Sequence, residues 1–426
     1  MAILTLFGLF IVLLIIGVPV ALAMGLTCIV VALQLDIPLS MLAQRMVTGI
    51  NSFPLLAIPF FILAGEIMNI GGISKRLVRF SDVLVGRFRG GLANVNITTS
   101  MLFGGISGSA LADASSIGSI LIPMMKKKGY DTDFSVAVTV SGATQGIIIP
   151  PSHNMIIYAL VAGAGVSISS LFLAGIIPGV LLGIALMVTS FIIAVKRKYP
   201  AEKPSSFKEV LVAAKEAVPG LFTGVIIIGG IISGIFTVTE SAAIGVAYAF
   251  IISFFVNRDV PLSKMVNVLS GTFKTMAIVV FLIAVSSGYA WLLAFLKVPA
   301  MISNGMLGLS DNPIVIKLII IAILLFLGMI LDVAPIILIT TPILLPIAQS
   351  VGMNPIHYGI VMMICMAIGL VTPPVGGALF VGSAIAKVPV EKVIKALVPF
   401  YVCMIVVLLL ATFVPQIVMV VPTLFN

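Results

Sequence analysis

The chain has 426 residues, of which 61% are hydrophobic and only 9% are charged, and its formal net charge is +9. Soluble globular proteins carry about 25% charged residues, so this chain lacks the polar surface that a water-soluble fold of its length needs. The composition excludes soluble enzymes, nucleic-acid-binding proteins and disordered proteins, and it indicates a protein that crosses a membrane several times.

Apolar segments in chain order predict an all-α polytopic membrane protein. A bilayer core of about 30 Å needs about 20 apolar residues per helix. Whole apolar spans are predicted at 2–17, 19–35, 52–70, 171–195, 218–235, 238–256, 275–296 and 396–422. The first two could instead form one long kinked helix. Four further apolar stretches are interrupted near their middles: 91–125, 132–163, 314–347 and 355–386.

The basic residues predict how the chain is oriented. Twenty of the 23 Lys and Arg residues fall in five loops that share one side of the membrane if the spans alternate: 72–90, 126–128, 196–217, 257–274 and 387–395. Lys and Arg concentrate on the cytoplasmic side of membrane proteins. Both termini are therefore expected on the periplasmic side, and the positive charge is interpreted as a topology signal. Glu and Lys alternate around apolar residues in 203–217, which predicts an amphipathic linker helix on the cytoplasmic surface.

The two halves of the chain resemble each other. A shift of 223 positions superposes the following residues: Gly105 on Gly328, Gly146 on Gly369, and Pro150–Pro151 on Pro373–Pro374. Residues 72–90 hold five basic residues, whereas the equivalent 299–312 holds none. The two halves differ in charge, and each is predicted to cross the membrane five times, which is an odd number. We therefore expect two repeats that are inverted relative to each other. Inverted repeats are typical of secondary transporters with a site at the membrane midplane.

The interrupted segments carry the candidate site. The midpoints of 91–125 and 314–347 are small and weakly polar, which favours re-entrant hairpins, although two ordinary spanning helices would give the same loop parity. In 132–163 and 355–386, tandem prolines remove backbone donors and leave upstream carbonyl oxygens as ligands for Na⁺. The half-helix that follows directs its positive end inward, which suits a carboxylate.

These arguments select two sets of residues. The candidate Na⁺ ligands are Ser107, Gly108, Asp113, Gly146, Ile149, Gly328, Asp332, Gly369 and Thr372. The candidate substrate-binding residues are Ser109, Ser152, His153, Asn154, Gly376 and Gly377. For His153, a satisfied interior histidine is the alternative to a substrate hydrogen bond. His357 lies near an outer helix start and is expected to be structural.

Four carboxylates lie within apolar segments, where an ionisable group costs at least about 2.5–3.5 kcal/mol. Asp113 and Asp332 lie at the hairpin tips and are expected to help bind a cation, with helix capping as the alternative. Glu66 is expected to reach the membrane surface or to pair with the basic segment 75–89. Glu240 is expected to cap a helix or to contact another subunit.

The energy source is also constrained by the sequence. The chain contains no GxxxxGK[ST] motif, the phosphate-binding loop of many ATP-driven proteins, so ATP is not expected to drive transport through this chain. No series of acidic residues along successive helices indicates a proton path, which favours Na⁺ as the coupling ion.

Four motifs in fixed order resemble the large membrane subunit of TRAP (tripartite ATP-independent periplasmic) transporters over essentially the whole chain. They are 104–110 (GGISGSA), Gly146 with Pro150–Pro151–Ser152, 238–242 (VTESA) and 372–376 (TPPVG). The resemblance implies Na⁺-coupled uptake of an organic acid across the bacterial inner membrane. It also implies two partners, a small four-helix membrane subunit and a periplasmic substrate-binding protein.

The resemblance further implies an elevator mechanism, in which a transport domain moves against a scaffold. The expected scaffold parts are 1–90 and 218–312, with arms at 72–89 and 299–312, and the expected transport parts are 91–195 and 313–426, with 196–217 as linker. Ser152, His153 and Asn154 offer hydrogen bonds after the first proline pair, which favours a sugar acid such as sialic acid over a C4-dicarboxylate. The alternatives are a stand-alone Na⁺/carboxylate symporter or ion antiporter, and a channel or scaffold that transports nothing.

Overall fold

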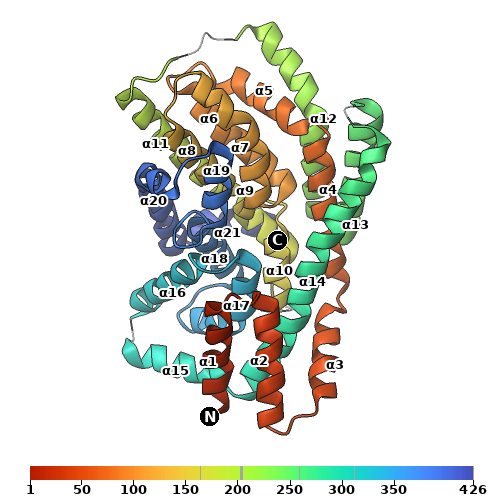
Figure 1. Cartoon of the computed structure of the whole chain (residues 1–426), viewed down its shortest axis with the longest axis vertical. Helices are drawn as coiled ribbons and strands as arrows, with labels where there is room; N and C mark the ends of the chain where they lie inside the picture. The colour runs from red at the N-terminus through yellow and green to blue at the C-terminus, as the bar shows by residue number, and fades with distance from the viewer. Residues whose placement is uncertain (164, 202–204, 259, 311, 426) are drawn as a thin grey trace.

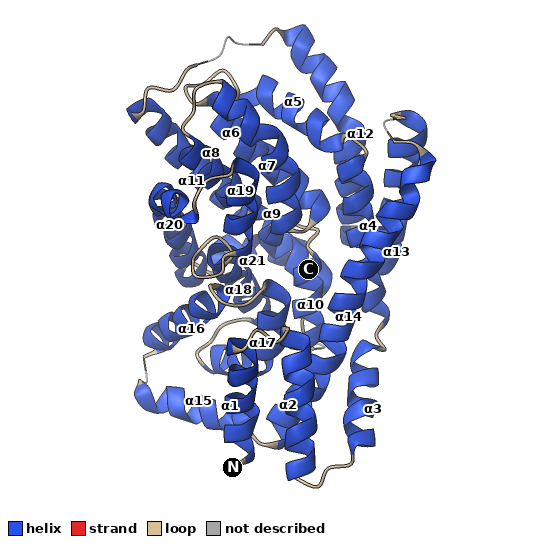
Figure 2. Ribbon diagram, in the orientation of Figure 1, coloured by secondary structure: helices blue, strands red, loops and turns tan. Residues whose placement is uncertain are grey.

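The structure is a computed structural model that describes residues 1–163, 165–201, 205–258, 260–310 and 312–425. Within these ranges the chain forms helices joined by short loops, and no strand is present. Figure 2 shows the helices packed into one elongated body. Seven of the described helices are long and apolar enough to cross a membrane, and counting one bent pair as a single span gives eight. The prediction of an all-α polytopic membrane protein is confirmed.

The N-terminal apolar residues form two short helices, so the alternative of one long kinked helix is wrong. α1 (Ala2–Ile15) and α2 (Val20–Gln34) lie side by side in Figure 1. Gly17 lies in the turn between them with a φ of 84°, a left-handed conformation that glycine adopts without steric strain. The first helix ends before this turn, and the chain reverses direction there.

A third helix, α3 (Leu39–Ile50), lies outside the spans that the sequence predicts. Its polar residues interrupt the apolar run, so a criterion based on apolar length misses it. α3 packs along α14 (Met265–Phe295), and the guanidinium of Arg45 lies 5.6 Å from the centre of the Trp291 ring. Cation–π contact of this kind stabilises the pair and accounts for a basic residue outside the five basic loops.

The next helices lead to the two predicted arms. A short 3₁₀ turn, η1 (Phe53–Leu56), continues into α4 (Ala57–Ile70), and α5 (Ile73–Val85) follows after two glycines. In the second half of the chain, α14 is followed by α15 (Val298–Leu309). Figure 1 shows α5 near one end of the molecule and α15 near the other.

Both segments predicted as hairpins consist of two helices with a break. The break between α6 (Gly91–Ser107) and α7 (Ala110–Lys127) falls at Gly108, whose φ of 63° ends the first helix. The break between α16 (Pro313–Gly328) and α17 (Val333–Ser350) falls at residues 329–332. Both breaks lie near the middle of their segments, where the sequence predicts them.

The proline pairs interrupt the other two segments, as predicted. α8 (Thr132–Ala143) and α9 (Gln145–Ile148) end before Pro150–Pro151, and α10 (His153–Ala162) continues at an angle of 43°. α18 (Pro355–Gly369) ends before Pro373–Pro374, and α19 (Gly377–Ala386) follows. The bond within each proline pair is cis. The helices on either side of each break are too short to cross a bilayer alone.

The remaining elements complete the body. They are α11 (Ile168–Lys196), α12 (Phe207–Ile232), α13 (Val238–Phe250), the π-helical turn η2 (Ile251–Val256), the 3₁₀ turn η3 (Leu262–Lys264), α20 (Val390–Phe413) and α21 (Gln416–Phe425). The predicted span at 275–296 belongs to the longer α14, which begins ten residues earlier.

Two predictions about these elements are wrong. The linker helix expected over 203–217 is not separate: α12 begins at Phe207 and runs on into the apolar span, and residues 202–204 lie outside the described ranges. Ser206 and Glu209 form a capping box that starts the helix, and the helix continues through Pro219 into the span. The last span, expected over 396–422, is two helices: α20 ends at Phe413 and α21 begins at Gln416. Val414 and Pro415 separate them, and proline is common just past a helix end.

The helix boundaries recur at the offset that relates the two halves of the sequence. Shifted by 223 positions, α7 coincides with α17 at both ends, and α8 begins where α18 begins. The order of a short helix, an interrupted helix pair, a broken helix and a long helix therefore occurs twice in the chain.

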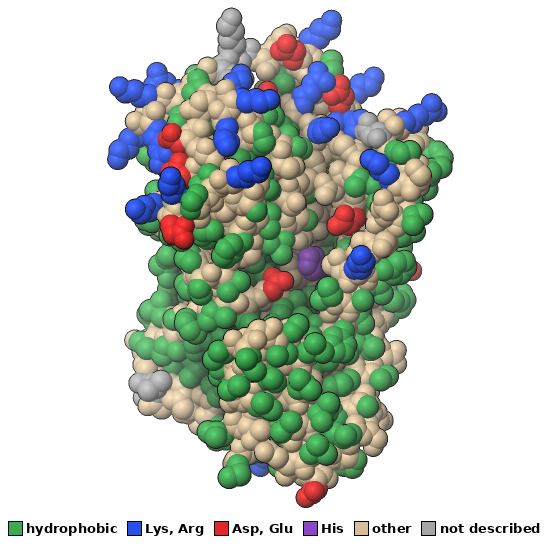
Figure 3. Space-filling model, in the orientation of Figure 1, with side chains coloured by type: hydrophobic (Ala, Val, Ile, Leu, Met, Phe, Trp, Pro, Cys, Tyr) green, Lys and Arg blue, Asp and Glu red, His purple; other side chains and the backbone are tan. Residues whose placement is uncertain are grey.

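The two ends of the molecule differ in their charged side chains. Figure 3 shows Lys and Arg gathered at the end where Figure 1 places α5 and the start of α12, while hydrophobic side chains dominate the rest of this face. The N-terminus lies at the opposite end, whereas α21 lies about halfway along the long axis. The clustering is that expected if the basic end faces the cytoplasm.

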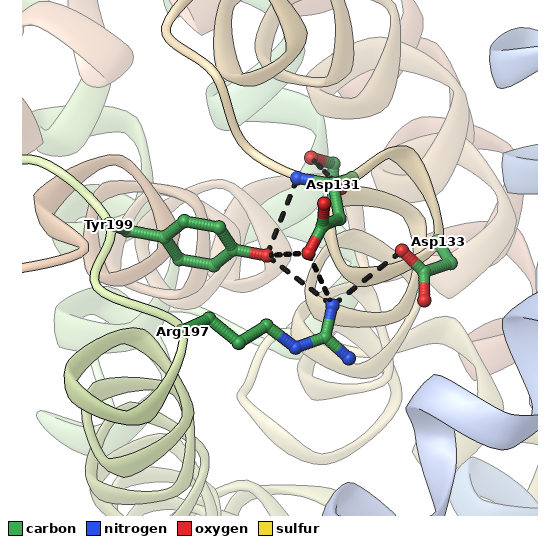
Figure 4. A network of polar contacts seen from close by, with 5 residues as sticks. Asp131, Asp133, Arg197 and Tyr199 are labelled. Atoms are coloured by element: carbon green, nitrogen blue, oxygen red, sulfur yellow. Dashed lines mark hydrogen bonds and ion pairs between the residues drawn. The ribbon is translucent and has the colours of Figure 1, made fainter.

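A polar network ties the first broken helix to α11 near the basic end (Figure 4). Arg197 Nη1 lies 2.8 Å from Asp131 Oδ2 and 3.7 Å from Asp133 Oδ1, and the Tyr199 hydroxyl donates to Asp131 Oδ2 at 2.7 Å. The hydrogen bond from Tyr199, assisted by Arg197, lowers the pKa of Asp131. Burial and the same hydrogen bond raise the pKa of Tyr199 to about 12. The network holds the start of α8 in place.

Candidate functional site

A cavity of about 320 Å³ lies where the two hairpin tips and the two broken helices meet. Two further helices, α4 and α14, form its other wall. Its polar lining residues are Glu66, Asn69, Ser107, Ser109, His153, Asn154, Thr275 and Asp332. The described residues of the lining include two carboxylates and no Lys or Arg. The cavity therefore combines segments that lie more than 200 residues apart in the chain.

Three helices begin at this cavity. The first residues of α7, of α10 and of α17 belong to its lining. The backbone N–H groups of a first helical turn have no partner within the helix, and together with the helix dipole they attract anions. Ser109 caps α7 and Asp332 caps α17 with their side chains, but no side chain caps α10. The N-terminus of α10 is thus the most available of the three for a bound carboxylate.

Asp113 lies behind the cavity wall. Its side chain is fully buried, its Oδ1 accepts a hydrogen bond from Ser107 Oγ, and its Oδ2 has no hydrogen-bond partner among the described residues. A buried carboxylate oxygen without a partner is unfavourable, so this oxygen marks a place where a cation or a proton would be stabilised. Ser107 itself belongs to the cavity lining and links Asp113 to it.

Glycines bring the first tip against the first break. A Cβ built on Gly104 would lie 2.9 Å from Cα of Gly146, and one built on Gly146 would lie 2.9 Å from Asp113 Oδ2. A Cβ on Gly108 would lie 2.9 Å from the carbonyl oxygen of Pro151. The close approach places carboxylate, hydroxyl and carbonyl oxygens near one another, and such oxygens are the ligands that hard cations prefer. The residues present therefore fit a Na⁺ ion.

Backbone atoms of the second tip and the second break lie in close contact. A Cβ on Gly369 would lie 2.5 Å from the carbonyl carbon of Gly328, and the backbone N–H of Val375 donates to the carbonyl oxygen of Met329 at 3.0 Å. Thr372 Oγ1 donates to the carbonyl oxygen of Ile368 at 2.6 Å. Asp332 is exposed, and its Oδ1 accepts from the backbone N–H of Val333 at 2.8 Å. Asp332 therefore caps α17, which is the alternative to cation binding that the sequence left open.

The structure places the residues predicted for the site in three groups. Those that line the cavity are Ser107, Ser109, His153, Asn154 and Asp332. Those at contacts between a tip and a break are Gly108, Asp113, Gly146, Gly328 and Gly369. Ile149, Ser152, Thr372, Gly376 and Gly377 belong to the breaks but not to the cavity lining. Ser152 is fully buried and its Oγ has no hydrogen-bond partner among the described residues.

The expectations for the other polar residues have mixed outcomes. No ion pair is present between Glu66 and the described basic residues of 75–89, and Glu66 instead lines the cavity. Glu240 forms a capping box with Thr237, as one of its two alternatives predicts. His357 Nε2 lies 2.7 Å from the carbonyl oxygen of Ala411 and is structural, as predicted.

Sequence reasoning missed three polar residues of the cavity: Glu66, Asn69 and Thr275. Asn69 Oδ1 accepts a hydrogen bond from Ser116 Oγ at 2.5 Å, which links α4 to α7. Glu66 and Asn69 are three residues apart on α4 and so share a helix face. That spacing was the available signal, but it does not show which neighbour the face contacts.

An all-helical membrane fold with a solute-sized interior cavity, rimmed by helix breaks and helix N-termini, has the features of a secondary transporter. Residues 7–417 match the family model described as "Tripartite ATP-independent periplasmic transporter, DctM component". The chain belongs to this family, as its motifs predict. Its curated relatives with named functions are transporter permeases, not enzymes.

Several relatives extend over nearly the whole chain. The chain is 44% identical to the uncharacterized protein YgiK of Salmonella typhimurium, over 99% of this chain and 98% of that protein. It is 40% identical to the sialic acid TRAP transporter large permease SiaM of Vibrio cholerae, over 90% of this chain and 89% of SiaM. It is also 40% identical to the C4-dicarboxylate TRAP transporter large permease DctM of Pseudomonas aeruginosa, over 89% of each chain.

One solved structure is similar in fold. The YdaH transporter of Alcanivorax borkumensis aligns with a TM-score of 0.63 at 13% identity, covering 88% of this chain and 89% of that chain. At this identity the likeness concerns the fold alone.

Proposed function

We propose that the chain is the large membrane subunit of a Na⁺-coupled uptake system for a sugar acid in the bacterial inner membrane. The observation that carries this proposal is the single cavity at which both hairpin tips, both helix breaks and three helix N-termini meet. Permeases of this family work with a small permease subunit and a periplasmic binding protein. We propose the same two partners for this chain.

The substrate carboxylate would bind at the N-terminus of α10, where His153 and Asn154 begin the helix at the cavity wall. No side chain caps these backbone N–H groups, so they supply donors for an anion. His153 Nδ1 is buried and has no hydrogen-bond partner among the described residues. It would complete its hydrogen bonding with the substrate.

The two carboxylates of the lining favour a substrate with hydroxyl groups. Glu66 and Asp332 are acceptors when ionised, and a second carboxylate of a dicarboxylic acid would be repelled by them, whereas sugar hydroxyls would donate to them. The two permeases named for sialic acid and for C4-dicarboxylates are equally identical to this chain, so sequence likeness does not choose between the substrates. The polar lining is the reason for preferring a sugar acid.

Sodium would bind at the two contacts between tips and breaks. At the first, Asp113 and Ser107 would supply side-chain oxygens, and Gly108, Gly146 and Ile149 backbone carbonyl oxygens. At the second, Gly328, Gly369 and Thr372 would supply oxygens from backbone and hydroxyl. Binding there would hold each tip on its break, so the ion would complete the site beside the substrate.

Inverted repeats and an elevator motion belong to this proposal. The recurrence of helix boundaries at an offset of 223 residues supports the repeats, and the positions of α5 and α15 at opposite ends support their inversion. The cavity is lined by the half of α4 next to α5 and by the first part of α14, so it lies toward the basic end. We propose that this conformation faces the cytoplasm, with the N-terminus in the periplasm.

The test is uptake of labelled sialic acid into proteoliposomes that contain this chain and the small subunit encoded with it. We expect uptake only with a Na⁺ gradient and with the loaded binding protein outside. Uptake by the chain alone would support a stand-alone symporter instead. Electrical current without Na⁺-dependent accumulation would support a channel and would refute the proposal.

A stepwise competition assay tests the substrate class separately. Unlabelled sugar acids are expected to reduce uptake in the complete system at concentrations at which succinate does not. Competition by succinate and not by sugar acids would transfer the assignment to C4-dicarboxylates while leaving the Na⁺ mechanism intact.

A further inference from the structure

Asn69 lies on the cavity wall that α4 forms, three residues after Glu66. Residues three positions apart share a helix face, and both side chains are half-buried. The amide of an asparagine has two chemically different ends, because its oxygen accepts hydrogen bonds and its nitrogen donates them. Which end faces the cavity therefore decides what this part of the wall can recognise.

Two buried serines hold the oxygen end of this amide. Ser116 Oγ on α7 donates to Asn69 Oδ1 at 2.5 Å, and Ser74 Oγ on α5 lies 2.9 Å from Ser116 Oγ. A serine hydroxyl has one proton to donate, so Ser116 uses its proton on Asn69 and accepts from Ser74. Both serines are buried, and neither belongs to the cavity lining. The amide oxygen of Asn69 is thus turned away from the cavity toward α7.

The nitrogen end of the amide stays available. Asn69 Nδ2 makes no hydrogen bond to the described residues, and it is not one of their buried unpartnered atoms. Because the oxygen is already occupied, the group that Asn69 offers to a ligand in the cavity is an N–H donor. Glu66, on the same face of α4, offers an acceptor when it is ionised. One turn of α4 therefore presents a donor and an acceptor side by side.

The contact between Ser116 and Asn69 has no counterpart at the second hairpin. Shifted by 223 positions, α7 coincides with α17, and Ser116 corresponds to Ile339. An isoleucine side chain has no donor, so α17 cannot hold an amide in this way. The contact is therefore an addition to the backbone plan that the two halves share.

We propose that Asn69 is a specificity-determining residue that donates a hydrogen bond to the substrate beside Glu66, and that Ser116 is the positioning residue that fixes its amide. The substrate group that fits this pair both donates and accepts, as a hydroxyl or a secondary amide does, whereas a second carboxylate only accepts. The inference rests on the proposed function. It adds which part of the wall recognises the end of the substrate that is remote from its carboxylate at α10.

The experiment measures KM and maximal rate for labelled sialic acid in the complete proteoliposome system. Asn69→Asp keeps an oxygen for Ser116 but removes the donor, so KM should rise by about tenfold or more while the maximal rate changes by less than about twofold. Ser116→Ala frees the amide to turn and should raise KM by about threefold, and Ser116→Thr, which keeps the hydroxyl, should restore it. The matched control is Ser119→Ala on the same helix. Its hydroxyl donates to the backbone carbonyl oxygen of Ser116 at 2.8 Å, so its loss should leave KM unchanged.

The outcomes separate this inference from the proposed function. An unchanged KM in Asn69→Asp would show that the amide does not donate to the substrate and would overturn the inference alone. A loss of maximal rate without a change of KM in Ser116→Ala would show that the contact only holds α4 and α7 together, which would overturn the positioning role. Should Ser116→Ala not fold, as its unfolding midpoint would show, Asn69→Asp decides, because it keeps the hydrogen bond from Ser116. Absence of uptake by the wild-type system would overturn the proposed function and this inference with it.

Discussion

The two hairpin tips follow one backbone plan but differ in their chemistry. At the first tip, Asp113 is fully buried under Ser107, and one of its oxygens has no partner among the described residues. At the second tip, Asp332 is exposed and caps α17. The difference shows that helix breaks alone supply backbone oxygens at both places, whereas only the first place adds a buried charge. The first tip is thus the stronger candidate for cation binding.

The largest effect is expected where the second tip touches its break through backbone. Gly369→Ala would place a Cβ 2.5 Å from the carbonyl carbon of Gly328, and backbone cannot move aside as a side chain can. Displacing a functional element by about 1 Å can cost about 100-fold in rate, so uptake should fall by at least that factor. Proteoliposome uptake and the unfolding midpoint measure the effect. Gly271→Ala is the control, because its Cβ would meet nothing within 4 Å. Unchanged uptake would show that the second tip needs no such contact.

The next effect separates the two carboxylates directly. Asp113→Asn should raise the Na⁺ concentration for half-maximal uptake by about tenfold or more, because a hydrogen bond or ion contact to a buried charge is worth about 1.5–3 kcal/mol. Asp332→Asn should change it by less than about twofold, since Asn is as good a helix cap as Asp. A Na⁺ titration of uptake measures both. Equal effects of the two substitutions would contradict the contrast between the tips.

A smaller effect is expected on the cavity wall that α4 and α14 form, where α4 contributes Glu66 and α14 contributes Thr275. Glu66→Gln should raise the KM for a sugar acid by about threefold to tenfold, the range that corresponds to about 0.6–1.4 kcal/mol. Thr275→Val should have a smaller effect, because it removes a neutral hydroxyl. Uptake kinetics with sialic acid measure both KM values. A change in maximal rate without a change in KM would show that Glu66 does not contact the substrate.

The smallest effect concerns the starts of the two broken helices. Asp131 belongs to the network with Arg197 and Tyr199, whereas Asn354, 223 positions later, makes only a cap to the backbone N–H of Ile356. The lowered pKa of Asp131 means that its contribution to stability is present above the pKa of the unfolded chain and is lost as the pH falls through the lower folded value.

Tyr199→Phe tests this contribution. The substitution should lower the unfolding midpoint at pH 7. The free energy of unfolding should fall by no more than about 1 kcal/mol, because Asp131 is partly exposed. The difference from the wild-type chain should shrink below about pH 4. Tyr248→Phe is the control, since Tyr248 packs against Phe222 and no polar contact of its hydroxyl is part of the network. A difference that is independent of pH would show that the ring, and not the hydrogen bond, stabilises the network.

Local sequence signals predicted the parts of the fold that depend on local chemistry. Proline pairs break helices wherever they occur, and the glycines of the first tip end α6, so both features could be located to within a few residues. Signals that require a partner were less reliable. The polar face of α3 concealed a helix, and α12 continues through Pro219 although a proline disfavours a continuous helix.

The site residues show the same difference between local signals and signals that require a partner. His153, Asn154, Ser107 and Ser109 line the cavity, because they flank the breaks. Glu66 does not pair with the basic loop, because α4 presents that side chain to the cavity instead. A single helix carries no information about which of its faces another helix will cover.

Taken alone, the amino-acid sequence determined that this protein belongs in a membrane, most of its helical segments, the helix breaks at the proline pairs and at the first tip, and the family to which it belongs. Only the tertiary structure decided that Asp113 is buried while Asp332 is exposed, and that Glu66 faces the cavity. Apolar length and proline act within a few residues of themselves, whereas the burial of a charge depends on segments that are distant in the chain and adjacent in space.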